Sequence, residues 1–370
     1  MKLNKWIGLI VTLVVLGCSS DSSNNDGDEN PTGGDNDFNR KSILTNWADN
    51  FIMPNYTAYV SATSKLTKAA NDFVVETNIQ SLTDLKVAYK EAYLSWQHVS
   101  MFEIGEAERI QLRNFTNIYP TNKANIDAKT GGLESYNLEL PSSFSEQGFP
   151  ALDYLLYGTG ETDEMVLAYF EDQVAAKDYL LALVNRLDKL GSQVLENWKT
   201  GYRDTYVNND SDAVNASFNK TVNAYVSYYE RFLRSGKVGI PAGALSGQQF
   251  PDRVEAYYVN DMSKELFLKA LDASKGFYLG TGATNISGAS LYDALKGLDQ
   301  NELADDISEQ FDVIREEASK LNDSFSYEVE NNNNALIGLR DLLQVNTILF
   351  KNDMVSALNV TISYQDNDGD

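Results

Sequence analysis

The chain has 370 residues, and 43% of them are hydrophobic, so it is long enough for one large domain or two ordinary domains with buried cores. Its formal net charge is −23. This charge argues against nucleic acid and against anionic membrane surfaces as partners, because both repel an acidic protein.

The first residues have the pattern of a targeting segment. Lys2 and Lys5 precede an apolar run, Ile7 to Leu16, which is too short to span a bilayer. The run ends at Leu16-Gly17-Cys18, which resembles a bacterial lipobox, in which the cysteine carries lipid. We therefore expect residues 1–18 to be a lipoprotein signal peptide and lipidated Cys18.

Residues 19–38 are rich in Ser, Asn, Asp and Gly and contain almost nothing that could be buried. This composition predicts a flexible tether. Acidic residues soon after the cysteine also resemble the surface-export signals of Bacteroidota lipoproteins. Together these features indicate an outer-membrane lipoprotein, on the periplasmic or the cell-surface side.

The rest of the chain has helical periodicity almost throughout. Apolar residues recur every three or four positions, which predicts amphipathic helices, and Pro54 is expected to kink or interrupt the first of them. The Gly and Pro residues of 235–258 predict a long loop. The predicted helices are 41–74, 81–104, a short one from 150, 163–199, 212–234, 261–275, 301–323 and a last one after 334. We expect an all-α protein with two helical-bundle domains, 39–236 and 237–370, joined by long irregular loops.

The stretch Gly148 to Gly158, reading GFPALDYLLYG, predicts a helix start beside a polar loop. Pro150 suits the first helical position, since its missing N–H is not needed there. Asp153 would then lie in the first turn, where the helix dipole favours an acid. It is either such a helix-start acid or part of a ligand pocket.

This stretch resembles the imelysin-like family, whose signature is Gly-x-His-x-x-Glu. Gly148 and Phe149 match the frame, but Pro150 replaces the family histidine and Asp153 replaces the glutamate. Weaker similarity occurs around Trp96-Gln97, at Tyr119-Pro120, and in residues 237–258, which look like Bacteroidota members. Ser100 stands where many relatives have a glutamate.

The resemblance implies an all-helical protein with the signature between two bundle-like domains. It also implies a ligand site, for which the candidate residues are Gly148, Phe149, Pro150, Asp153, Trp96 and Ser100. Asp153 is the candidate metal ligand, because its carboxylate is a hard oxygen donor. Its side chain is one methylene shorter than that of glutamate. The departures from the family pattern at Pro150, Asp153 and Ser100 together suggest that metal binding is altered or lost.

Family members have been discussed as metallopeptidases and as iron-uptake proteins. A catalytic zinc ion needs three protein ligands that include His or Cys, but this chain has one histidine, His98, and one cysteine, Cys18. We therefore expect a protein that is not an enzyme. Iron is the cofactor that the resemblance suggests, and the fold does not require it.

Two hypotheses of different classes follow. In the first, the chain is a membrane-anchored, imelysin-like binding protein associated with the acquisition of iron, haem or another metal. Its partners would be a metal, haem or small ligand and an outer-membrane uptake receptor. In the second, it is a surface lipoprotein that binds glycans or a protein partner through Tyr-rich loops; the chain has 21 tyrosines, a residue type suited to amphipathic contacts.

Overall fold

The computed structural model describes residues 38–282 and 286–364 of the chain. The predicted signal peptide, the lipidation site at Cys18 and all of the predicted tether except Phe38 lie outside the described residues. Phe38 contacts the ring of Phe218, with ring centroids 5.1 Å apart. The described residues belong to one compact unit.

The predicted all-α class is confirmed. Among the described residues there is no β-strand, and only an isolated antiparallel bridge joins Thr281 to Ser287. The first part of the chain contains α1 (Arg40–Asn46), η1 (Trp47–Ile52), α2 (Met53–Val75), α3 (Ile79–Trp96), α4 (Glu106–Arg109), α5 (Leu112–Thr116), α6 (Lys123–Thr130), η2 (Pro141–Glu146), α7 (Gly148–Asp153), η3 (Tyr154–Gly158), α8 (Asp163–Asp172), α9 (Ala176–Asn197), η4 (Trp198–Tyr202) and α10 (Arg203–Asn208).

The later part continues with α11 (Ser217–Tyr228), η5 (Tyr229–Gly239), η6 (Pro251–Arg253), α12 (Ser263–Leu279), α13 (Leu291–Gly297), α14 (Asn301–Ser319), α15 (Phe325–Asn331), α16 (Asn333–Ile348), η7 (Leu349–Met354) and α17 (Val355–Ala357). Elements η1, η3, η4, η5 and η7 are π-helical, whereas η2 and η6 are 3-10 helices.

Pro54 does not break the predicted helix, which is continuous from Arg40 to Val75, but the hydrogen-bond pattern changes beside this residue. It lies in the first turn of α2, directly after the π-helix η1. Because proline lacks an N–H group and its ring displaces the carbonyl one turn earlier, the regular α-helical hydrogen bonds cannot continue through this position. The single helix predicted over 163–199 is wrong: residues 173–175 separate α8 from α9.

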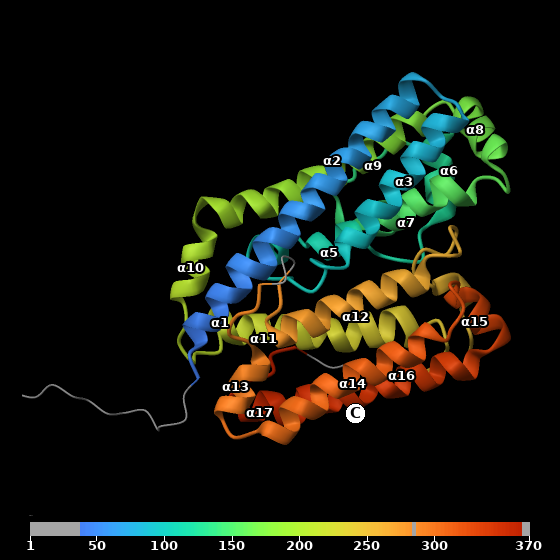
Figure 1. Ribbon diagram of the computed structural model, residues 1–370. Helices are drawn as coiled ribbons and strands as arrows, with labels where there is room; N and C mark the ends of the chain where they lie inside the picture. The colour runs from blue at the N-terminus through green and yellow to red at the C-terminus, as the bar shows by residue number, and fades with distance from the viewer. Residues whose placement is uncertain (1–37, 283–285, 365–370) are drawn as a thin grey trace, which may run out of the picture. The chain divides into compact units, whose positions relative to one another are not determined.

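Two sets of helices are visible in Figure 1. In the first set, α2 packs along both α3 and α9. In the second set, α11 continues into η5, and η5 packs against α16, which in turn contacts α14. The helix formed by α11 and η5 runs through residue 236. The division at 236 and 237 stays a prediction.

The core is rich in aromatic side chains. Trp47 stacks on Phe277, with centroids 4.5 Å apart, and on Phe218 at 5.6 Å, which links η1 to α12 and α11. Tyr59 of α2 contacts Trp96 of α3 at 5.5 Å. Each such pair contributes about 0.5 to 1.5 kcal/mol beyond the burial of its area, so these contacts fix how the helices pack. Within the described residues, no helix is both long and apolar enough to cross a bilayer.

Candidate functional site

The signature stretch forms the short helix α7, and all six of its residues are buried. Gly148 has a φ of +74°, and a Cβ atom at this position would lie 2.1 Å from the carbonyl oxygen of Thr116. Only glycine therefore fits here, because a side chain would meet both a left-handed backbone and an immovable main-chain atom. This requirement explains the first glycine of the signature.

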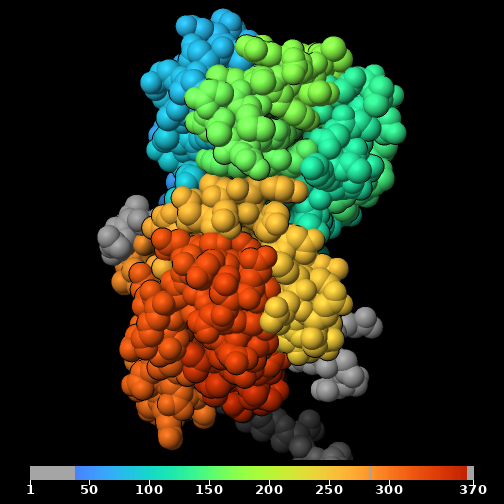
Figure 2. Space-filling model, turned by 90° about the vertical axis from the view of Figure 1, so that its right-hand side faces the viewer, coloured from blue at the N-terminus to red at the C-terminus, as the bar shows by residue number. Residues whose placement is uncertain are grey.

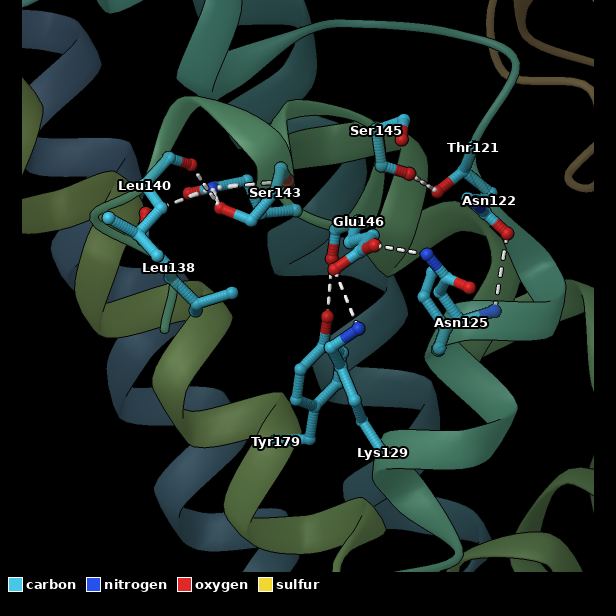
Figure 3. A network of polar contacts seen from close by, with 12 residues as sticks. Thr121, Asn122, Asn125, Lys129, Leu138, Leu140, Ser143, Ser145, Glu146 and Tyr179 are labelled. Carbon is cyan, nitrogen blue, oxygen red and sulfur yellow. Dashed lines mark hydrogen bonds and ion pairs between the residues drawn. The ribbon is translucent and has the colours of Figure 1, made fainter. Parts of the chain in front are cut away.

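A buried polar network holds the chain immediately before α7 (Figure 3). The carboxylate of Glu146 pairs with the Lys129 ammonium at 2.7 Å and accepts a hydrogen bond from the Asn125 amide. The Tyr179 hydroxyl donates a hydrogen bond to the backbone carbonyl of Glu146. The side chain of Gln147 donates to the carbonyl of Leu138 at 2.9 Å. These contacts connect the residues before α7 to α6 and α9, so the protein's own side chains fix the start of α7 without a ligand.

Phe149 has a packing role. Its ring stacks on that of Tyr93, with centroids 4.4 Å apart and planes 7° from parallel, and it also contacts Tyr89 at 6.3 Å. The side chain is completely buried. Phe149 therefore docks α7 on α3.

Asp153 is the last residue of α7, and no acid lies in the first turn of this helix, so its predicted place as a helix-start acid is wrong. The carboxylate instead crosses to another segment. Its two oxygens accept backbone N–H groups of Tyr258, at 2.8 Å, and Val259, at 2.9 Å. The helix begins earlier than Pro150 predicts because Gly148 and Phe149 already belong to it.

The ionisation of Asp153 is strongly perturbed. Only 2% of the residue is exposed, and burial raises the pKa of its carboxyl to about 7, against the lowering effect of the two backbone N–H groups. A carboxyl group that titrates near neutral pH, next to a cavity, is a common mark of a functional site.

Asp153 and Pro150 line a cavity of about 100 Å³, which we call the Asp153 cavity. Its other walls come from the Tyr119-Pro120-Thr121 segment and from residues 252–258. A water molecule occupies about 30 Å³ in the liquid, so this cavity admits a few waters or one end of a ligand. It cannot enclose a whole haem.

Trp96 and Ser100 line a second, smaller cavity of about 20 Å³, which we call the Lys237 cavity. Tyr119 lines both cavities, so the two lie next to each other. The structure thus brings Pro150 and Asp153 to one cavity and Trp96 and Ser100 to its neighbour. Gly148 and Phe149 line neither of the two.

Lys237 and Glu255, which both line the Lys237 cavity, form an ion pair, and their side chains are 5% and 2% exposed. The Lys237 ammonium donates a hydrogen bond to the side-chain oxygen of Gln97 at 2.9 Å, and the Asn117 amide donates one to Glu255 at 2.7 Å. The Tyr93 hydroxyl donates to Asn117 at 2.7 Å. Burial lowers the pKa of Lys237, and Glu255 opposes that effect.

The segment Asp252 to Tyr258 connects the cavities. Asp252, Val254 and Ala256 line the Asp153 cavity, whereas Glu255 between them lines the Lys237 cavity. Ala256 has a φ of +58°, which is uncommon for a residue with a side chain. Such strain is found at functional sites where surrounding contacts enforce it, and here the N–H groups of Tyr258 and Val259, two and three residues further on, are held by hydrogen bonds to Asp153.

Sequence reasoning missed two members of this site as such. Tyr119 appeared only in a weak family match, and Asn117 gave no signal, because an asparagine in a loop resembles any turn residue. Glu255 lines the Lys237 cavity, and its contacts with Lys237 and Asn117 also hold the loop in place.

The side chains at the Asp153 cavity do not fit a metal ion held by the protein alone. Within 38–282 and 286–364, no group of three or more His, Cys, Asp or Glu side chains could hold one. Both oxygens of Asp153 already accept N–H groups. Burial, with a smaller contribution from Asp153, raises the pKa of Tyr258 to about 12, so its phenol stays protonated at neutral pH.

His98 lies in the turn after α3 and is partly buried. Burial lowers its pKa, and the charge of Lys269 acts in the same direction. It is not among the residues that line the Asp153 cavity or the Lys237 cavity.

The fold and the site define an all-helical protein in which a short buried helix and a returning loop enclose small polar cavities. The imelysin family model matches residues 52–343, and the chain belongs to the imelysin family. The same family carries the name peptidase M75. No curated protein matches the chain significantly.

Two solved structures resemble the chain in fold. One is a provisionally named iron-regulated protein A precursor from Parabacteroides distasonis, with a TM-score of 0.69, 16% identity, and coverage of 85% of this chain and 95% of that one. The other is an imelysin-like protein from Psychrobacter arcticum, with a TM-score of 0.65, 18% identity, and coverage of 88% and 97%.

Proposed function

We propose that this chain is a membrane-anchored binding protein of the imelysin family that takes part in the acquisition of iron, haem or another metal and catalyses no reaction. One feature carries the proposal: a buried carboxyl group, Asp153, lies at the wall of a cavity, and burial raises its pKa to about 7. The name of the Parabacteroides distasonis relative adds the link to iron.

The ligand would be a small metal-bearing molecule. The protein offers too few donor side chains at the Asp153 cavity to hold a bare ion, and the cavity accepts only part of a ligand. A haem or a metal chelate would place one polar edge against Asp153 and keep most of its own metal ligands.

A metallopeptidase is disfavoured by the chemistry of the whole chain. A hydrolytic zinc site uses three protein ligands and keeps a position for water. With one histidine and one cysteine in 370 residues, such a site could not be built from these two residue types alone, and carboxylates would have to supply the remaining ligands.

The anchor and the partner belong to the same proposal. Lipidated Cys18 and the tether would hold the body at the outer membrane, on the periplasmic or the cell-surface side, within reach of an uptake receptor. Binding of glycans or of a protein partner is the alternative.

Titration of the full chain in detergent tests the proposal. Iron(III) alone and haemin are the probes, and quenching of tryptophan fluorescence is the readout. We expect haemin to bind, iron(III) alone to bind weakly, and Asp153→Asn to weaken haemin binding at least tenfold. Asp312→Asn, which changes a carboxylate that is 65% exposed, is the matched control. If neither probe binds, or if both variants bind haemin as the wild type does, the proposal is wrong.

A further inference from the structure

A third cavity, of about 210 Å³, lies between η5, α16 and the loop after η5, and we call it the arginine cavity. Three of its lining residues are arginines, Arg234, Arg253 and Arg340, and none of the described residues that line it is acidic. In a chain with a net charge of −23, such a concentration of cations requires an explanation. Figure 2 shows the yellow and gold part of the chain, to which this loop belongs, at the surface between the blue-to-green and the orange-to-red helices.

The three arginines are held in different ways. Arg234 is 1% exposed, and its guanidinium lies 3.6 Å from the carboxylate of Glu230. Arg340 pairs with its neighbour Asp341 at 3.1 Å, but that carboxylate is 63% exposed, so the pair contributes little. The guanidinium of Arg253 lies over the ring of Phe250, 3.9 Å from the centroid, and no carboxylate among the described residues pairs with it. Arg253 and Arg340 therefore remain available to an anion.

The same cavity has an apolar side. Ile240, Leu245 and Phe250 line it, and Ile240 and Leu245 are 45% and 67% exposed. Exposed apolar side chains that gather beside a cavity indicate a surface that a ligand covers. The cavity thus combines cations with apolar walls.

The loop that forms this cavity is shaped before binding. Gly243 has a φ of +71°, and a Cβ atom there would lie 2.1 Å from the carbonyl oxygen of Gln248. Backbone hydrogen bonds from Gly247 to Gly243 and from Phe250 to Pro241, both 2.8 Å, close the loop. A preformed loop loses little conformational freedom on binding, which favours affinity.

We propose that the arginine cavity is a binding site for a small organic anion, with an apolar body against Ile240, Leu245 and Phe250 and a carboxylate or phosphate group on Arg253 and Arg340. Guanidinium groups bind both kinds of anion through paired hydrogen bonds. The site is separate from the Asp153 cavity, because the two share no lining residue. A test of anion binding at the arginine cavity is therefore independent of a test of the proposed function at the Asp153 cavity.

Calorimetric titration of the full chain in detergent, with micelles alone as the blank, tests this proposal. The probes are 3-phenylpropionate and phenyl phosphate, and benzyl alcohol and benzylammonium test the need for a negative charge. We expect at least one of the two anions to bind, with an affinity about tenfold or more higher than that of benzyl alcohol or benzylammonium. The preferred anion then identifies the head group.

Arg253→Gln and Arg340→Gln should each weaken anion binding about tenfold, since each removes a charge-assisted contact. Arg315→Gln, on an arginine of α14 that is 50% exposed, should leave it unchanged. Arg253 is exposed and the Arg340 side chain is 22% exposed, and far-ultraviolet circular dichroism tests whether each variant keeps its fold. No binding of either anion, equal binding of benzyl alcohol, or wild-type affinity in both arginine variants would overturn the proposal.

Discussion

Lys237 of η5 and Glu255 of the following loop form an ion pair with both side chains almost completely buried. The pair spans two segments that the sequence presents as one irregular stretch. Gln97 binds Lys237 and Asn117 binds Glu255, so each charge has a second polar partner. Such a pair is sensitive to the loss of one member, because the remaining charge stays buried without compensation.

Lys237→Met should therefore destabilise the protein by about 3 to 5 kcal/mol, measured as the free energy of unfolding in urea. The double variant with Glu255→Leu should regain most of that loss, since no buried charge remains. Lys320→Met is the matched control, because Lys320 pairs with Glu317 at the surface, with side chains 54% and 48% exposed. This variant should lower the free energy of unfolding by less than about 1 kcal/mol. A double variant less stable than Lys237→Met would contradict this account.

Asp153 predicts a dependence of stability on pH. Its pKa is raised from 3.8 to about 7 in the folded protein, because burial disfavours the charged form. The folded state therefore holds this proton more tightly than the unfolded state, and the stabilisation present below about pH 4 is lost as the pH rises to about 7. Each pH unit between the two pKa values corresponds to about 1.4 kcal/mol, so the loss amounts to a few kcal/mol.

Asp153→Asn isolates this effect. The variant does not titrate at this position, and its amide can accept only one of the two backbone N–H groups. The unfolding free energy of the wild type minus that of the variant should decrease from pH 4 to pH 7, because only the wild type loses this stabilisation. Above pH 7 the difference should stay constant. Urea unfolding at several pH values measures it. A difference that does not change with pH would show that the carboxyl titrates normally.

Periodicity alone was sufficient for much of the fold. The apolar spacing of α9, α12, α14 and α16 was predicted because each of these helices buries one face and exposes the other. The π-helical segments were not predicted. A π-turn changes the register of the helix by one residue, and no residue type marks it as proline marks a kink.

The candidate site was predicted in part. Gly148 and Pro150 marked the start of α7, because their backbone preferences are local. The partners of Asp153 could not be predicted, since the N–H groups of Tyr258 and Val259 lie more than 100 residues away and any residue except proline carries such a group. The same limit applies to Asn117 and Glu255, which tertiary contacts bring together.

The lipobox resemblance at Cys18 predicts where the protein resides. Cys18→Ser should remove the lipid and release the protein from the membrane fraction, because a thioether-linked lipid requires the cysteine sulfur. Fractionation of cells followed by detection of the chain measures this, and Ser19→Ala is the matched control. Wild-type protein that is found entirely in the soluble fraction would contradict the prediction.

Gly148 provides the sharpest test of the signature helix. Gly148→Ala must place a Cβ atom 2.1 Å from the Thr116 carbonyl oxygen on a backbone with a φ of +74°. Left-handed strain of about 1 to 2 kcal/mol and overpacking of about 1 to 3 kcal/mol should together lower the free energy of unfolding by at least about 2 kcal/mol.

Gly338→Ala is the matched control for Gly148→Ala and should have the opposite effect on stability, since Gly338 lies inside α16 with nothing within 4 Å of the added atom. Removal of a helical glycine should stabilise the protein by about 0.5 to 1 kcal/mol. Thermal unfolding of both variants measures the contrast, and a Gly148→Ala protein as stable as the wild type would show that α7 does not begin with the backbone described here.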